Sequence, residues 1–346
     1  MLRPIVEVLE EYDHYGLTIN ELGTGLINQT WLVETDRDET FVLQCVNPAF
    51  PASVNDDIAA VTAHLRAKGQ LALEIVPNCN GDLTTVYADD NWRLMSFIDG
   101  VSYDGLASVA QAKEAGAALA AFHRGVSDLE INFSHQRPHV HDTPRHVAAL
   151  NQALTEHADH SRFSHIQPLA HDILKRVEQL PVLPGTPERL VHGDPKISNL
   201  LFDKTGKALC WVDLDTLAYM ALPLEMGDAF RSWCNPTSED APEPEFRIDY
   251  FAAAAEGYAA AAGNFVTEAE WRAFADGTEI ILVELAARFC ADALNESYFG
   301  WNAERFADRS AHNLIRAEGQ LNLQRAFASE QAQAQAAVIE AFGDSG

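Results

Sequence analysis

Two short stretches of the sequence carry its clearest chemical signal: H-G-D-P-K-I-S-N at residues 192–199 and W-V-D-L-D at residues 211–215. Apolar runs that are typical of short strands lie around them, at residues 190–192, 200–202 and 209–212. The polar turn at residues 203–207 separates the last two runs as in a hairpin. The sequence therefore predicts a loop with an aspartate and an asparagine after one strand, and further aspartates at the end of the next hairpin.

The residue types in these stretches suit the transfer of a phosphoryl group. Such a transfer needs a carboxylate that accepts the proton of the substrate hydroxyl, and oxygen ligands that hold Mg²⁺ on the phosphates. Asp194 suits the first task, whereas Asn199 and Asp213 suit the second, because Mg²⁺ prefers hard oxygen ligands. Taken singly, each residue could also serve a turn or a helix cap with no chemical role. Their joint spacing favours the chemical interpretation.

The first hundred residues have the pattern of a small antiparallel sheet with one helix. Four runs are expected to form strands: residues 30–34, 40–46, 84–87 and 92–95. Residues 89–91 form the expected turn between the last two strands. Residues 55–66 have helical spacing, with Ile58, Val61 and Leu65 on one face.

After residue 100 the pattern becomes mainly helical. Residues 104–126 and 311–342 are typical of helices, and the strands around residues 190–212 interrupt the helical region. At about 150 residues per domain the length fits two domains or lobes. The sequence therefore predicts an α+β protein with a β-rich part at residues 1–99 and a larger helical part at residues 100–346.

A glycine-containing turn lies near the start of the β-rich part, in the segment GTGLINQTWLV at residues 23–33. Glycine has no side chain, so backbone N–H groups at such a turn can approach a nucleotide phosphate. A plain hairpin turn would give the same pattern. The position of the segment ahead of the 192–199 loop is what favours a phosphate-binding role.

The 192–199 loop and Asp213 together resemble the H-x-D-x-x-x-x-N motif and metal-binding aspartate of protein kinases, with Gly193 in place of arginine. The glycine form is typical of the aminoglycoside phosphotransferase and choline kinase superfamily. Several segments occur in the order expected of its N-acetylhexosamine 1-kinase branch: GTGLINQTWLV, FVLQCVN, WRLMSFIDG, HGDPKISNLLFD, WVDLDT, EMGDAFRSW and ELAARFCADAL. The resemblance spans about residues 20–325.

This resemblance implies a bilobal, protein-kinase-like fold, with a small antiparallel β-rich N-lobe that binds nucleotide and a larger, mainly helical C-lobe. It implies ATP and Mg²⁺ as cofactors, with ATP between the lobes. The residues implied to bind the nucleotide are Gly23, Thr24, Gly25, Asn28, Gln44, Met95, Phe97 and Ile98.

The resemblance also assigns chemical roles by position. Asp194 is implied as the catalytic residue that orients or deprotonates the acceptor hydroxyl. The implied metal ligands are Asn199, Asp213 and Asp215, although Asp215 could equally be a structural carboxylate. The implied substrate residues are Asp194, Asp228, Arg231 and Arg288, with Asp228 expected to hydrogen-bond the catalytic loop. The alternative for Arg288 is an intrahelical salt-bridge ladder with Glu284 and Asp292, which share its helical face.

One position departs from protein kinases. Their third strand carries a lysine that pairs with the α- and β-phosphates, whereas the corresponding strand here has Gln44. An amide donates hydrogen bonds but carries no charge. Gln44 is interpreted as a feature of the hexosamine-kinase branch, and the alternative is a nucleotide-binding pseudokinase.

The expected function is transfer of the γ-phosphoryl group of ATP to a small sugar or alcohol. The favoured acceptor is the anomeric hydroxyl of an N-acetylhexosamine, which would give a sugar 1-phosphate. A cationic acceptor such as an aminoglycoside, choline or an amino alcohol is the alternative within the same class.

Composition narrows the possible partners. The chain has 24 Lys and Arg against 51 Asp and Glu, for a formal charge of −27, so nucleic acid and anionic membranes are unfavourable partners. Five scattered cysteines without a CxxC pair suggest reduced thiols. No apolar leader or membrane span is evident, so we expect a cytoplasmic protein, monomeric or homodimeric.

Histidines are concentrated in one region. Eight of the 13 lie within residues 135–171. A metal site is one interpretation, but the surroundings are polar and lack cysteine, so a solvated loop–helix region is favoured.

Overall fold

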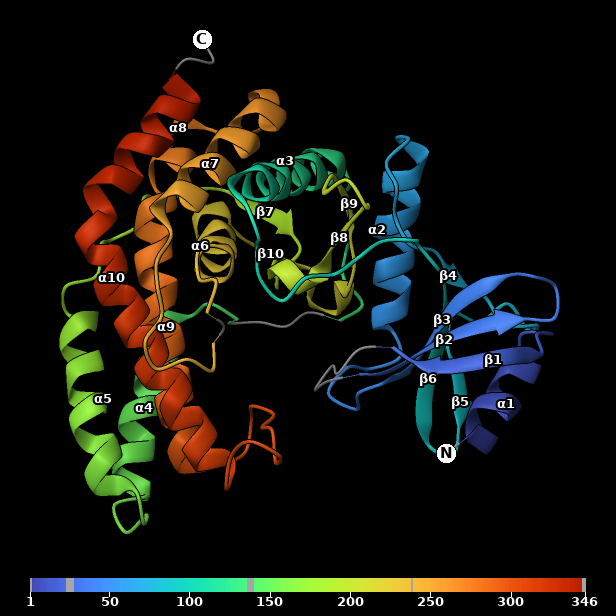
Figure 1. The fold of residues 1–346 in the computed structure, drawn as a ribbon, viewed down its shortest axis with the longest axis horizontal. Coiled ribbons are helices and arrows are strands. Elements are labelled where there is room, and N and C mark those ends of the chain that lie inside the picture. The colour runs from blue at the N-terminus through green and yellow to red at the C-terminus, as the bar shows by residue number, and fades with distance from the viewer. Residues whose placement is uncertain (1, 23–27, 136–139, 238, 344–346) are drawn as a thin grey trace. The chain divides into compact units, whose positions relative to one another are not determined.

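The computed structural model describes residues 2–22, 28–135, 140–237 and 239–343, and it confirms the α+β class (Figure 1). The chain divides into two compact units. Unit 1 comprises residues 1–100, 128–136 and 212–217, and unit 2 comprises residues 101–127, 137–211 and 218–346. Within the described residues, no helix is both long enough and apolar enough to cross a membrane.

Unit 1 is built on an antiparallel sheet. Its elements are α1 (Leu2–Glu10), β1 (Gly16–Glu21), β2 (Gln29–Thr35), β3 (Thr40–Val46), α2 (Val54–Ala67), β4 (Ile75–Val76), β5 (Thr85–Tyr87), β6 (Asp90–Ser96) and the short 3₁₀ helix η2 (Leu214–Thr216). The strand order is β1-β2-β3-β6-β4, with β5 also paired to β6. The predicted strands and the predicted helix at residues 55–66 are therefore present.

The two faces of this sheet carry different side chains because neighbouring residues of a strand point to opposite sides. One face packs against α1, where Ile5, Val8 and Leu9 join an apolar cluster with Trp31 and Trp92. The opposite face carries Thr30, Gln44 and Arg93, which are cross-strand neighbours on β2, β3 and β6. The first face packs on α1, and the second combines these polar side chains with the apolar Leu32, Val42 and Met95.

The turn before β6 differs from the prediction. Residues 89–91 were expected to form it, but Tyr87 pairs with Asp90, so the turn consists of Ala88 and Asp89. Both have positive φ, 53° and 70°, as a two-residue turn with the twist of a hairpin requires. The turn expected from the polar residues 89–91 therefore began one residue later than the turn in the structure.

Unit 2 is mainly helical. Its helices are α3 (Val109–Val126), α4 (Thr143–Glu156), α5 (Phe163–Val177), α6 (Leu222–Trp233), α7 (Ile248–Ala262), α8 (Glu268–Arg272), α9 (Phe274–Asn295) and α10 (Arg309–Gly343), with η1 (Ile197–Asn199) and η3 (Gly263–Phe265) as 3₁₀ helices. Two small antiparallel ribbons complete it: β7 (Glu188–Val191) pairs with β10 (Ala218–Ala221), and β8 (Leu200–Phe202) pairs with β9 (Ala208–Trp211).

Helix α3 starts later than predicted. The pattern indicated a helix from residue 104, but the helix begins after Ser108, whose hydroxyl accepts a hydrogen bond from the Gln111 N–H. This side chain satisfies an N–H that has no partner within the helix, and so it fixes the helix start. The predicted C-terminal helix lies within α10.

Close helix crossings hold unit 2 together. A Cβ on Gly116 of α3 would lie 2.0 Å from the Ala254 carbonyl oxygen, and one on Gly257 of α7 would lie 2.0 Å from the Lys113 oxygen. Figure 1 shows α9 lying beside α10 in the same unit. Nearly every residue of α9 is buried, because α4, α5, α6 and α10 all pack against it.

The α3–α7 crossing gives a test of the fold. Gly257→Ala should lower the free energy of unfolding by about 1–3 kcal/mol, because the added methyl group meets backbone rather than a movable side chain. Chemical denaturation measures this loss. Gly185→Ala is the control, since a Cβ there meets nothing within 4 Å. Equal stability of the two variants would contradict the close crossing.

Candidate active site

The loop that follows β7 organises the predicted catalytic residue within unit 2. Asp194 is half-buried, and Gly193 before it has a φ of +82°, a conformation that favours glycine. Lys196 Nζ donates to Asp194 Oδ2 over 2.7 Å. Asn199 Nδ2 donates to the Asp194 carbonyl oxygen over 2.9 Å and to Oδ2 over 3.3 Å. In the described part of the chain these donors use Oδ2, which leaves Oδ1 to accept a proton.

Asp194 is ionised at neutral pH. Burial disfavours its charged form, but the nearby Lys196 ammonium, with smaller effects of His192 and Arg231, holds the pKa of Asp194 below its usual 3.8. Lys196 was not expected at the site, and its position two residues after the aspartate was the available signal.

Helix α6 fixes the backbone of this loop. The fully buried Glu225 accepts hydrogen bonds from the His192 N–H over 3.0 Å and from the Gly193 N–H over 3.1 Å. Trp233 Nε1 donates to the Pro195 carbonyl oxygen over 2.8 Å. Three backbone groups that would otherwise be buried without partners are therefore satisfied by one helix.

Asp228 was expected to hold the catalytic loop, and Glu225, one turn earlier on α6, makes those bonds instead. The carboxylate of Asp228 accepts from Arg231 Nε over 2.9 Å. Arg231 also pairs with Glu239, and these carboxylates keep the pKa of Arg231 above its usual range although burial opposes its charge. Arg231 is therefore a paired, buried cation that adds positive field at Asp194.

Arg288 is only partly engaged. Its Nη1 lies 3.7 Å from Glu284 Oε1 and 3.5 Å from the Val140 carbonyl oxygen. Asp292 accepts instead from the backbone N–H groups of residues 297–299 and from Asn313. Of the expected salt-bridge ladder, the Arg288–Glu284 contact is present but long. Asp292 instead holds the backbone of the loop after α9.

Glu284 anchors the start of the histidine-rich region. It is fully buried and accepts from His141 Nδ1 and Thr143 Oγ1 over 2.8 and 2.6 Å. Burial opposes its ionisation, but the His141 hydrogen bond holds the pKa of Glu284 below its usual range. No group of three or more His, Cys, Asp or Glu suited to a metal occurs among the described residues, which exclude His139. His141 therefore has a buried carboxylate as its partner.

The predicted metal-binding turn lies in unit 1. Asp213 adopts the left-handed conformation, with φ 61° and ψ 56°, immediately before η2. Asp215 is buried, and its carboxylate accepts hydrogen bonds from Arg93 and from Asn28 Nδ2, the latter over 2.8 Å. Asp215 therefore has at least two side-chain partners in this arrangement.

The residues predicted to bind the nucleotide lie in different surroundings. Gly23, Thr24 and Gly25 lie outside the described residues. Gln44 accepts from Arg93 and donates to Thr30 Oγ1 over 3.0 Å, so it is part of the Asp215 network. Met95 is buried in β6, and Phe97 and Ile98 follow it half-buried. Their roles in nucleotide binding stay predictions.

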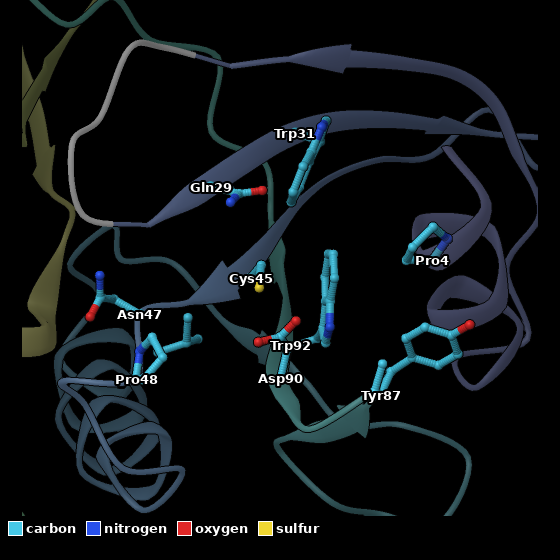
Figure 2. A pocket seen from close by; sticks show the side chains of 11 residues that line it. Pro4, Gln29, Trp31, Cys45, Asn47, Pro48, Tyr87, Asp90 and Trp92 are labelled. Atoms are coloured by element: carbon cyan, nitrogen blue, oxygen red, sulfur yellow. The ribbon is translucent and has the colours of Figure 1, made fainter. Parts of the chain in front are cut away.

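A separate hollow of about 300 Å³ lies in unit 1 on the sheet face that carries Trp31, Cys45 and Trp92 (Figure 2). The rings of the two tryptophans are stacked at 5.4 Å between centroids. This is the face opposite to Gln44 and Arg93, because strand neighbours alternate. The hollow is therefore distinct from the polar network.

The α+β fold, with a His-Gly-Asp loop that presents an ionised aspartate beside a lysine and an asparagine, defines the class of kinase-like phosphotransferases. A profile of the phosphotransferase enzyme family, APH, matches residues 18–264. The chain belongs to this family, and it is a small-molecule phosphotransferase with a hydroxyl acceptor.

Solved structures show the same fold at low identity. Amicoumacin kinase hAmiN, solved with AMP-PNP, Ca²⁺ and Ami, has 13% identity and a TM-score of 0.59, over 91% of this chain and 95% of that one. An aminoglycoside 2′-phosphotransferase-IIIa mutant with GDP has the same identity and TM-score, over 95% and 98%. Choline kinase from Cryptosporidium parvum Iowa II has 13% identity and a TM-score of 0.56, over 90% of each chain. These similarities confirm the protein-kinase-like fold.

The role of α6 can be tested with Glu225→Gln. The amide keeps one acceptor oxygen but turns an NH₂ group toward backbone N–H donors, so kcat should fall by about 10- to 100-fold through misplacement of the loop. Steady-state kinetics measure this effect. Glu268→Gln is the control, since that side chain is exposed. Normal turnover in Glu225→Gln would exclude the proposed support of the loop.

The pH dependence of activity tests whether Lys196 lowers the pKa of Asp194. Because the pKa of Asp194 is lowered, the basic form persists above it and activity is lost only as the pH falls through a value below 3.8. Lys196→Met removes the neighbouring cation, so the acid limb of kcat/KM should move to higher pH. Profiles of the wild type and the variant measure the shift. A limb that does not move would show that Lys196 does not set the charge of Asp194.

Proposed function

We propose that this phosphotransferase transfers the γ-phosphoryl group of ATP to the anomeric hydroxyl of an N-acetylhexosamine, giving ADP and a sugar 1-phosphate. The observation that supports it most is Asp194, ionised and held through Oδ2 by Lys196 and Asn199, with Oδ1 left for a proton. The hexosamine acceptor rests on the order of sequence segments that resemble the N-acetylhexosamine 1-kinase branch.

In the proposed reaction, Asp194 Oδ1 accepts the hydroxyl proton as the acceptor oxygen bonds to the γ-phosphorus. The bond from that phosphorus to the bridging oxygen breaks, and ADP leaves with the electron pair. An anomeric hydroxyl is more acidic than an ordinary alcohol, so a carboxylate of low pKa is a sufficient base. Lys196, beside Asp194, would place positive charge where the transferred group gathers negative charge.

A divalent cation fits the donor set of this chain. Asn199 Nδ2 is engaged by Asp194, which orients the amide so that Oδ1 is the atom presented for another ligand. Asn199 would supply this amide oxygen and Asp213 a carboxylate, both hard ligands of the kind that Mg²⁺ prefers. When bound, Mg²⁺ would neutralise phosphate charge. The AMP-PNP and Ca²⁺ in the amicoumacin kinase structure support the choice of ATP and a divalent cation.

A cationic acceptor is the second candidate. It is favoured by the amicoumacin kinase, aminoglycoside phosphotransferase and choline kinase structures, which share the fold. A net charge of −27 does not decide between the two, because acidic groups are common over the whole sequence.

The acceptor can be identified by incubating the protein with MgATP and a panel of hexoses, N-acetylhexosamines, aminoglycosides and amino alcohols, followed by ³¹P NMR. An anomeric phosphate doublet would establish the sugar 1-kinase activity. A signal that comes only from a non-anomeric phosphomonoester would move the protein to another branch of the superfamily, and its formation from an aminoglycoside or amino alcohol would support the second candidate. ATP that binds but stays intact with the whole panel would favour a pseudokinase.

The role of Asp194 is tested with Asp194→Asn. The amide cannot take the proton, so kcat should fall by about 10²- to 10⁴-fold while ATP affinity changes little. Turnover with the acceptor found in the panel and a nucleotide-binding titration measure the two quantities. Asp159→Asn, at an exposed position, is the matched control. Near-normal turnover would remove Asp194 from the mechanism.

A further inference from the structure

Arg93 is a fully buried cation in unit 1, and burial of a charge is costly unless the charge is paired. It lies on β6 directly opposite Gln44 of β3, since the two are register partners. Gln44 occupies the strand position at which protein kinases carry a phosphate-binding lysine. The positive charge missing from Gln44 is therefore present on its cross-strand neighbour.

The guanidinium of Arg93 uses every one of its N–H groups within the protein. Five hydrogen bonds are made: Nε and Nη2 to Gln44 Oε1, Nη1 to Asn55 Oδ1, and Nη1 and Nη2 to the two oxygens of Asp215. An arginine has no further donors to offer. Arg93 thus has none left for a phosphate in this arrangement, and its role must differ from that of the kinase lysine.

The other end of the ion pair lies in the turn that carries Asp213. The carboxylate of Asp215 accepts hydrogen bonds from Arg93 and from Asn28 Nδ2. The side-chain oxygen of Asn28 in turn accepts a hydrogen bond from the Asn47 N–H over 2.9 Å. These contacts tie the turn to β6 and to the residues that precede β2 and follow β3. Asp213 has a left-handed backbone that a non-glycine residue adopts only where its surroundings require it.

We propose that Arg93 is a positioning residue for phosphoryl transfer, which fixes through Asp215 the turn that presents Asp213 to the nucleotide-bound metal. This inference rests on the proposed use of ATP and a divalent cation. It also explains Gln44, because a lysine at that position would face Arg93 directly, and like charges opposite each other destabilise a sheet. Gln44 instead offers its carbonyl oxygen to Arg93.

The test is a binding measurement that needs no acceptor. The affinity of Mn²⁺ for the complex of the protein with AMP-PNP is followed by electron paramagnetic resonance in the wild type and in Arg93→Gln. Loss of a residue that orients a metal ligand weakens metal binding by about 10- to 100-fold, and we expect a loss of that size. Arg37→Gln is the control, since Arg37 forms an exposed ion pair with Asp13 in the same unit.

Moving the charge sharpens the test. Gln44→Lys should weaken Mn²⁺ binding in the wild-type background, where two cations would meet. In the Arg93→Gln background, Gln44→Lys should strengthen Mn²⁺ binding relative to Arg93→Gln alone. The introduced ammonium group would then be the cation available to Asp215. A change that reverses its sign with the residue at position 93 is not expected of a purely structural role. If Arg93→Gln does not fold, Arg93→Lys is measured instead, with a smaller loss expected.

Two results would overturn the inference. Unchanged binding in the folded Arg93 variant would show that the turn needs no ion pair. Tighter binding would show that Asp215 is a metal ligand that Arg93 withholds. Failure of the wild type to bind Mn²⁺ with AMP-PNP is a different result, which would refute the proposed use of nucleotide and metal.

Discussion

The buried carboxylate of Glu225 accepts hydrogen bonds from two backbone N–H groups of the loop at residues 192–199. The conformation of this loop depends on that contact. The loop leaves β7 with a positive φ at Gly193 and cannot continue a ladder of backbone bonds. Its amide groups lie in the protein interior, where an unpaired N–H costs about 1–3 kcal/mol. Glu225 removes this cost at residues 192 and 193, and Trp233 satisfies the Pro195 oxygen. Asp194 can then keep one carboxylate oxygen for chemistry.

Unit 1 uses a comparable arrangement with the charges exchanged. There a buried arginine on a strand holds a turn through Asp215, whereas in unit 2 a buried glutamate on a helix holds a loop. In both cases a buried charged group holds the segment next to a residue that is proposed to act in phosphoryl transfer.

The sequence predicted what short-range patterns determine. The 192–199 loop, the hairpin after it and the helix at residues 55–66 follow from local spacing and from residues within a few positions of one another. The family match confirmed the class of enzyme drawn from those motifs, and the similar solved structure confirmed the fold. The Glu225 contact spans 33 residues and the Arg93–Asp215 pair spans 122, so both depend on how elements pack. Local patterns do not carry that information, and the resemblance to kinases placed Asp228, rather than Glu225, at the loop.

The crossing of α6 and α9 has a consequence for how the loop moves. A Cβ on Gly227 of α6 would lie 2.4 Å from the Gly277 oxygen, so the two helices touch backbone to backbone. The helix that binds the loop is thereby part of a closely packed region of unit 2. The amide protons of His192 and Gly193 should then exchange with solvent water only when the whole unit unfolds. On this basis the loop should share the stability of the helices that hold it.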